Sequence, residues 1–338
     1  MNLKYKCYWG EIPEEFSLWL INRYKTPYCT VEYNRLFCET ISLNCFSIYD
    51  DDTLVHLIIF GFEPQYKKIN ILNRVFELDI EYLNLFSNYI FNTKLQIDKI
   101  QINHLINPLL YNHLFPSICT LFDEDYVIKL PGSTSEYISR LSSNMRRHTK
   151  NYISKIERTF GNYSFNIFEK DDVSEEIINK IVKMNHLRMN AKNIVSGIDQ
   201  SYANKIIRFA QNFGFISVFK IDGEIVAGLI SYSIGNNYFV EEISSDPQYD
   251  KFDVGHTCLF LTIQDCISRG GKEFHLLWGN SSYKSRFLAE RCQLYSVSIF
   301  RTHYLKQKHR FINELLPCMS AKYLFKIFKR KMKKILGR

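Results

Sequence analysis

A short run of sequence patterns between residues 238 and 287 constrains the fold more than any other part of this chain. Apolar residues at 238–244 predict a strand, and the helix predicted at 257–268 ends before Gly270 and Gly271. A second apolar strand is predicted at 274–277, and a polar turn follows it. This order leaves the free backbone N–H groups of a helix N-terminus where they can hold an anion. The segment therefore predicts an α/β unit with an anion site.

Two adjacent glutamates lie in the first of these strands. Strand alternation places Glu241 and Glu242 on opposite faces, so that one of the two points into the cleft. A carboxylate there could take the proton of an attacking amine if burial raised its pKa. The alternative is that both lie at a solvent-accessible strand end and pair with lysines. Which glutamate faces the cleft stays open at this stage.

Residues 254–258 are predicted to bind the anion through their backbone amides, and Gly255 would let a phosphate approach closely. The alternative is an ordinary helix start that Asp253 or Thr257 caps. In the turn after the second strand, Tyr283 is predicted to protonate a leaving group or to bind the acceptor, and Lys284 to anchor a phosphate or carboxylate. A surface turn is the alternative. The predicted anion-binding residues are Val254, Gly255, His256, Thr257 and Cys258.

Two basic segments lie outside this unit. The helix predicted at 145–160 carries Arg146 and Arg147, which we expect either to bind an anionic acceptor or to form a solvated face. In the C-terminal segment 323–338, apolar residues alternate with lysines and arginines. Such an amphipathic cationic helix can lie on anionic lipid, or it can dock on the protein with its lysines in solvent.

Composition excludes several classes of protein. The net charge of +8 comes largely from residues 322–338, which include no acid, so general nucleic-acid binding is weakly supported. The nine cysteines form no CxxC pair, which favours a reducing cytoplasm over disulfides or a zinc site, and no metal cofactor is expected. No signal peptide is visible, and no run of about 18 apolar residues predicts a membrane span. We therefore expect a cytoplasmic protein, with its tail at the inner face of the cell membrane.

A faint internal repeat suggests two similar α/β halves. The segments 46–60 and 218–232 each read as an apolar strand, an acidic turn and a second apolar strand. We expect an α/β domain at 1–132, a connecting basic helix at 133–163, a second domain at 164–312 and a basic tail at 313–338.

The second half resembles the GNAT-type N-acyltransferases, in particular the two-domain branch related to peptidoglycan aminoacyl (Fem-type) transferases and polysaccharide-associated acetyltransferases. The hairpin, loop, helix and strand of 215–277, the segment WGNSSYKSRF and the basic helix SSNMRRHTKNYISKIER carry the resemblance. It implies a mixed, mostly antiparallel GNAT-type sheet flanked by helices, with two GNAT-like halves of which the N-terminal one is degenerate. In place of the family's glycine-rich cofactor motif only Gly255 is clear, with Gln248 too far upstream.

The resemblance implies an N-acyltransferase that moves an acyl group from acetyl-CoA or another acyl-CoA to an amino group on a sugar or a cell-envelope glycan precursor. One alternative is an aminoacyl-tRNA-dependent transferase acting on a lipid-linked precursor, which the reduced glycine motif and the basic helix would suit. Another is a catalytically inactive, membrane-peripheral envelope protein that confers resistance to antimicrobial peptides.

Overall fold

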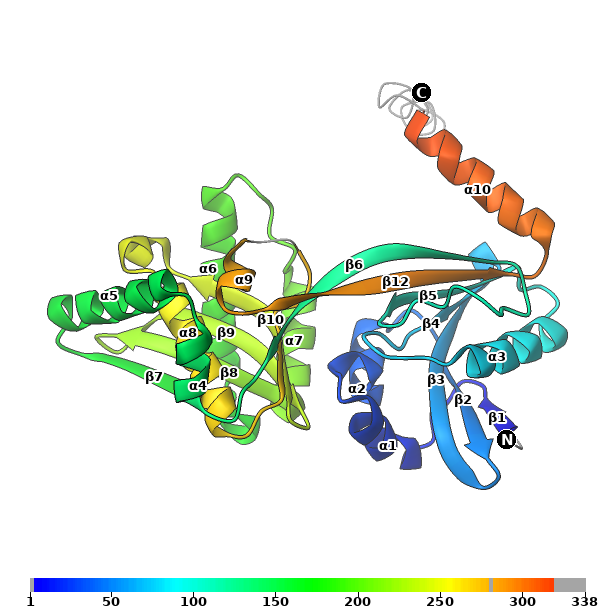
Figure 1. Ribbon diagram of the computed structural model, residues 1–338, viewed down its shortest axis with the longest axis horizontal. Coiled ribbons are helices and arrows are strands. Elements are labelled where there is room, and N and C mark those ends of the chain that lie inside the picture. Colours follow the sequence, from blue (N-terminus) through cyan, green and yellow to red (C-terminus); the bar gives the residue numbers. More distant parts are fainter. Residues whose placement is uncertain (1–2, 280–281, 319–338) are drawn as a thin grey trace.

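A computed structural model describes residues 3–279 and 282–318 of the chain, so that the predicted tail helix at 323–338 lies outside the described residues. Two α/β halves lie side by side, and one 12-stranded sheet runs through both of them (Figure 1). The strand order is β1-β2-β3-β4-β5-β12-β6-β11-β10-β9-β8-β7. Most neighbours pair antiparallel, and helices flank the sheet, so the predicted fold class is confirmed.

The first half is built from the N-terminal third of the chain. Its helices are α1 (Glu15–Tyr24), η1 (Pro27–Cys29), α2 (Val31–Phe37), η2 (Pro64–Tyr66) and α3 (Ile80–Thr93). Its strands are β1 (Leu3–Tyr8), β2 (Leu43–Asp50), β3 (Thr53–Glu63), β4 (Lys68–Ile71) and β5 (Lys99–Leu105). β4 and β5 run parallel because α3 returns the chain between them.

The second half repeats this arrangement. Its helices are α4 (Thr134–Arg140), α5 (Ser143–Thr159), η3 (Lys170–Asp172), α6 (Glu175–Ala191), α7 (Gln200–Phe213), η4 (Pro247–Phe252), α8 (Val254–Ser268) and α9 (Ser282–Arg286). Its strands are β7 (Tyr163–Glu169), β8 (Gly214–Ile221), β9 (Glu224–Ile234), β10 (Asn237–Ser245) and β11 (Glu273–His275). α8 connects the parallel pair β10 and β11, as α3 connects β4 and β5.

The predicted internal repeat corresponds to equivalent hairpins of the two halves. Segment 46–60 lies in β2–β3 and segment 218–232 in β8–β9, and each hairpin is second and third from its end of the sheet. Asp222 and Gly223 turn the second hairpin with φ of 50° and 85°, as expected for an Asp-Gly turn between apolar strands.

Two long strands, β6 (Ser117–Lys129) and β12 (Glu290–Phe300), are exchanged between the halves. β6 follows β5 in the chain but pairs with β11, whereas β12 follows β11 but pairs with β5. The two strands also pair with each other at the centre of the sheet. The exchange means that a division of the chain at residue 132 separates β6 from its neighbour β11.

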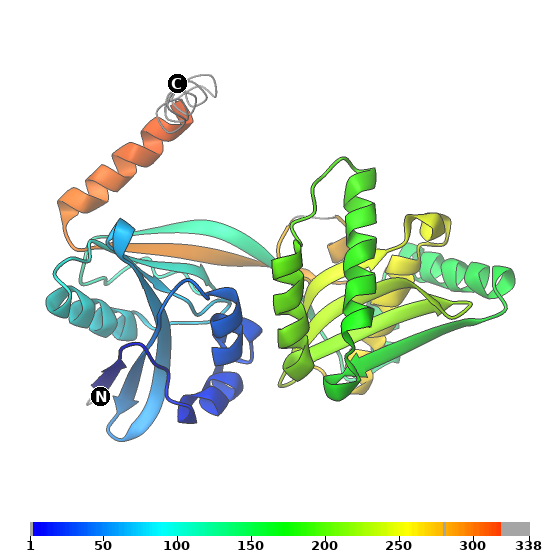
Figure 2. The ribbon, with the colours of Figure 1, turned by 180° about the vertical axis from the view of Figure 1, so that it is seen from behind.

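Helices cover both faces of the second half. α4, α5 and α8 pack on one face, and α6 and α7 cover the other, as Figure 2 shows from behind. Asp199 and Ser174 cap α7 and α6 by accepting hydrogen bonds from backbone N–H groups of their first turns. The side chains of Cys258 and Cys266 on α8 are fully buried against the sheet. This packing holds the start of α8 in a fixed position beside the end of β10.

A terminal helix, α10 (His303–Cys318), follows β12 and projects away from the two halves (Figure 1). Among the described helices, none is long and apolar enough to cross a membrane.

Candidate functional site

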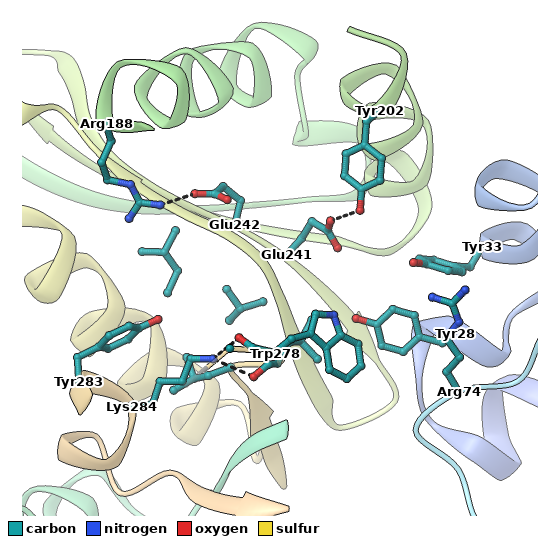
Figure 3. Close-up of a pocket in the computed structure, with 15 residues that line it drawn as sticks. Tyr28, Tyr33, Arg74, Arg188, Tyr202, Glu241, Glu242, Trp278, Tyr283 and Lys284 are labelled. Carbon is teal, nitrogen blue, oxygen red and sulfur yellow. Dashed lines mark hydrogen bonds and ion pairs between the residues drawn. The ribbon is translucent and has the colours of Figure 1, made fainter. Parts of the chain in front are cut away.

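The parallel strands β10 and β11 separate partway along their length and open a fork in the sheet. They pair only from Asn237–Glu273 to Phe239–His275; beyond that point Leu276 donates its backbone hydrogen bond to Tyr126 of β6 instead. A cavity of about 500 Å³ lies at this fork, between the two halves (Figure 3). The carboxyl ends of parallel strands are a common place for ligands in α/β sheets.

A β-bulge brings both predicted glutamates into this cavity. The pairing of β10 with β9 shifts between Val240 and Glu242, so that Glu241 has no partner on β9. Both Glu241 and Glu242 consequently line the cavity. The prediction that the two point to opposite faces was wrong, because it assumed regular alternation along the strand.

Glu241 lies in an aromatic part of the cavity without a cationic partner among the described residues. The hydroxyl of Tyr202 donates a 2.6 Å hydrogen bond to its carboxylate. Burial raises the pKa of the Glu241 carboxyl, while this hydrogen bond opposes the rise. Burial and the charge of Glu241 also raise the pKa of the Tyr202 hydroxyl. The arrangement suits a carboxylate that accepts a proton from a ligand in the cavity.

Glu242, on the same strand as Glu241, forms an ion pair with a residue of α6. Its carboxylate lies 3.0 Å from Arg188 of α6 and accepts a 2.7 Å hydrogen bond from the Ser244 hydroxyl. The side chain of Glu242 is 14% exposed, so the pair is largely shielded from water. These contacts fix the arginine at the wall of the cavity.

Tyr283 and Lys284 reach the cavity from the short helix α9. Burial raises the pKa of the Tyr283 hydroxyl, which keeps its proton available for donation. The Lys284 ammonium is buried and donates hydrogen bonds to the carbonyls of Leu277 and Trp278, at 2.8 and 2.6 Å. Lys284 therefore holds the turn after β11, and its predicted role as an anchor for a phosphate or carboxylate stays a prediction.

The first half supplies a wall of the cavity that sequence reasoning missed. Tyr28, Tyr33 and Arg74 line it from η1, α2 and the connection between β4 and α3. Trp278, from the second half, packs against Tyr28 with ring centroids 5.7 Å apart. Arg188 and Tyr202 were missed as well. The internal repeat could have indicated Arg74. This residue follows β4 in the first half, at the position that corresponds to the loop after β10 in the second half.

The predicted anion-binding residues lie at the start of α8, outside the residues that line the cavity. Val254, Thr257 and Cys258 have buried side chains, which leaves their backbone for any contact with a ligand. A Cβ on Gly255 would lie 3.3 Å from the hydroxyl oxygen of Ser245, so close packing on β10 by itself favours glycine there. The role of these residues in binding a cofactor stays a prediction.

His256, in the same turn, faces the basic helix. Its Nε2 lies 2.9 Å from the Thr149 hydroxyl of α5, and its ring packs on Phe287 with centroids 4.9 Å apart. Burial lowers the pKa of His256, which favours the neutral imidazole. α5 thus covers part of the start of α8.

Arg146 and Arg147 lie near the N-terminal end of α5. Arg146 donates hydrogen bonds to the carbonyls of Ser139 and Leu141 at the end of α4. Arg147 is exposed and bonds Asn144. Neither residue lines the cavity, and their predicted contact with an anionic acceptor stays a prediction.

Comparison with known proteins assigns the second half to a family. Residues 143–285 match the family described as "Acetyltransferase (GNAT) domain", which confirms the resemblance seen in the sequence. No curated protein matches the chain by sequence.

Solved structures share this fold over 73–91% of the chain. FemX aligns with a TM-score of 0.66 and 8% identity over 91% of this chain and 99% of its own. A conserved protein of unknown function from Bacteroides thetaiotaomicron aligns with a TM-score of 0.53 and 9% identity, over 87% of this chain and 99% of its own. L-PGS from Bacillus licheniformis aligns with a TM-score of 0.50 and 14% identity, over 73% of this chain and 81% of its own. At these identities the likeness shows the fold alone.

Proposed function

Because this chain is a two-domain transferase with a GNAT-type acetyltransferase domain at residues 143–285, we propose that it moves an acyl group from acyl-CoA to a primary amine. The acyl donor is acetyl-CoA in its simplest form, and the amine belongs to an amino sugar or another cell-envelope precursor. The observation that supports this most is the bulge in β10, which presents Glu241 to the cavity at the fork of β10 and β11.

Glu241 is the general base of the proposed reaction. An amine arrives protonated and must lose a proton before it can attack a carbonyl. The Glu241 carboxylate, whose pKa burial raises, accepts that proton and passes it to solvent. Glu242 is held by Arg188 and acts as a positioning residue instead.

Tyr283 is the proposed general acid. Attack of the neutral amine forms the N–C bond, and collapse of the intermediate breaks the C–S bond. The departing thiolate takes the hydroxyl proton of Tyr283, and the phenolate regains a proton from the new amide nitrogen. Free coenzyme A and an N-acyl product result, with one proton released to solvent overall.

The start of α8 is the proposed site for the pyrophosphate of the donor. Its first turn contains no acidic residue, whereas α3, its counterpart in the first half, carries Glu81 there. Backbone N–H groups and the helix dipole at such a position favour an anion. This contrast supports a single donor site, in the second half.

The test is release of free thiol from acetyl-CoA in the presence of glucosamine or other primary amines. We expect turnover in the wild type and a loss of about 10²–10⁴-fold in kcat/KM for Glu241→Gln. Glu224→Gln, an equal change at an exposed position of β9, should leave the rate unchanged. Full activity of Glu241→Gln would refute its role as the base.

A charged tRNA is the second candidate for the donor. The observation that favours it is that Ser245 and the α5 residue Thr149 lie against the first turn of α8. α5 also carries exposed arginines and lysines that suit a phosphate backbone. Calorimetry with coenzyme A separates the donors: binding of coenzyme A supports the first, and binding of charged tRNA alone supports the second.

A further inference from the structure

Arg74 is the cation of the cavity that the proposed reaction leaves unused. Within residues 3–279 and 282–318, its guanidinium forms no ion pair with a carboxylate and donates no hydrogen bond. The cavity's other cations have partners, because Arg188 pairs with Glu242 and Lys284 bonds two carbonyls. Figure 3 shows the Arg74 guanidinium beside the rings of Tyr28 and Tyr33. A ligand in the cavity would find this cation available.

Arg74 and Glu241 face the same group of tyrosines from two sides. Burial raises the pKa of Tyr33, the charge of Glu241 adds to the rise, and the charge of Arg74 opposes it. The same influences act on Tyr202. The two charges are therefore close enough to act on shared neighbours, yet they form no ion pair with each other.

The cavity thus has the Glu241 carboxylate and a free Arg74 guanidinium, with aromatic rings beside both of them. An ammonium group is stabilised by a carboxylate and by the faces of Tyr and Trp rings. A guanidinium presents a planar fork of N–H donors that matches a carboxylate. The volume of about 500 Å³ leaves room for a small molecule that carries both groups.

We propose that the acceptor carries a carboxylate as well as its amine, and that Arg74 binds this carboxylate while Glu241, Tyr28 and Trp278 hold the amine. The substrate class is therefore an amino acid, an amino-sugar acid or a peptide end with both groups free. This inference rests on the proposed function, since it takes the cavity to be the acceptor site. Under this proposal the first half, through Arg74 and Tyr28, helps to determine which acceptor binds.

A phosphate on the acceptor fits the cavity less well than a carboxylate. Glu241 and Glu242 both line the cavity, and a dianion would meet their negative charges with one free cation to offset them. A monoanionic carboxylate paired with an ammonium adds no net charge. The charge balance of the cavity thus favours a zwitterion.

Binding of matched amines without any acyl donor tests the proposal. The first set is glucosamine, muramic acid (the same amino sugar with a lactyl carboxylate) and glucosamine 6-phosphate; the second is hexylamine and 6-aminohexanoate. Calorimetry should show at least one carboxylate-bearing amine binding about 10- to 100-fold more tightly than its partner without the carboxylate, as expected for a charge-assisted hydrogen-bonded pair.

Variants of Arg74 then test whether this residue causes the preference for carboxylate-bearing amines. Arg74→Gln should remove the preference for the carboxylate and leave binding of the plain amine unchanged, and Arg74→Lys should restore part of it. Arg35→Gln, an exposed change on the neighbouring helix α2, should keep the full preference. Thermal unfolding of each variant checks that the fold is intact.

Three results would overturn the proposal: equal binding of amine and amino acid in the wild type, tighter binding of the 6-phosphate, or a preference that survives Arg74→Gln. Because no acyl donor is present, these outcomes do not depend on whether transfer from acetyl-CoA occurs. Failure of the proposed reaction would appear separately, as an absence of thiol release.

Discussion

The hydroxyl of Tyr202 donates a 2.6 Å hydrogen bond to the Glu241 carboxylate, across the gap between α7 and the bulge in β10. This contact stabilises the ionised form of Glu241 against burial, which favours the neutral form. It is thus one of the groups that set the pH at which Glu241 can accept a proton.

Removing this hydroxyl should shift the pH profile of the reaction upward. Tyr202→Phe takes away a hydrogen bond that opposes the effect of burial, so the pKa of Glu241 should rise further. The acidic limb of kcat/KM against pH should move to higher pH. Tyr33→Phe removes a hydroxyl that forms no hydrogen bond with Glu241 among the described residues, and it should leave that limb in place. A profile unchanged by Tyr202→Phe would contradict the assignment.

Glu242→Gln should reduce stability through Arg188. The change leaves the guanidinium, whose Nε has no acceptor among the described residues, without its carboxylate partner. After allowance for partial exposure of the pair, the free energy of unfolding should fall by about 1–2 kcal/mol. Glu224→Gln, which breaks the exposed pair with Lys180 on the same helix, should change it by less than about 0.5 kcal/mol. If urea titrations gave the same loss of stability for Glu242→Gln and Glu224→Gln, burial would not strengthen the Glu242–Arg188 pair.

Lys284→Met should destabilise the turn that carries Trp278. The carbonyls of Leu277 and Trp278 would lose their donor, and Leu277 already adopts an unfavourable positive φ of 49°. We expect a loss of about 2–4 kcal/mol in the free energy of unfolding. Lys129→Met, a change at an exposed position, is the control. If Lys284→Met unfolds like the wild type but binds the acyl donor more weakly, Lys284 is a ligand anchor as the sequence predicted.

His275 should make stability depend on pH. Its ring nitrogens lie 2.6 Å from Asp125 and 3.2 Å from Glu273. Burial acts to lower the pKa of His275, but these carboxylates outweigh it and raise the pKa. The hydrogen bond to His275, with help from Lys129, lowers the pKa of Glu273 to about 2.

The sign follows from these directions. The contribution of His275 is fully present below its ordinary pKa of 6.5 and is lost as pH rises through the raised value. The contribution of Glu273 is present above 4.5 and is lost as pH falls toward 2. His275→Gln should therefore cost most between pH 4.5 and 6.5, by about 2–4 kcal/mol, and less at pH 9. A cost independent of pH would refute the charged pairing; Glu290→Gln on β12 serves as an exposed control.

Local patterns predicted α5, α8 and the hairpins β2–β3 and β8–β9, because amphipathic periodicity and turn residues act over a few residues. β6 and β12 were not predicted. β6 contains three consecutive acids, Asp123, Glu124 and Asp125, which read as a turn, and both strands are exposed along part of their length. Their exchange between halves depends on contacts far apart in the chain, which no local pattern records.

The candidate site divides in the same way. Glu241, Glu242 and Tyr283 could be singled out from the strand and the polar turn that carry them; all three line the cavity, and their catalytic roles stay a prediction. The shared orientation of the glutamates depends on one unpaired residue in β10, which strict alternation excludes. Arg74 and Tyr28 reach the cavity only because the two halves pack together, so their role required the assembled fold.

The exchanged strands also impose an order on synthesis. β5 leaves the ribosome about 190 residues before its neighbour β12, so the half that is made first is the last to be completed. Until residue 300 emerges, β5 has an open edge that invites pairing with the wrong strand, and β6, which follows it in the chain, is the nearest competitor. A nascent chain that paired β5 with β6 would have to undo that hairpin before either half could reach its native sheet.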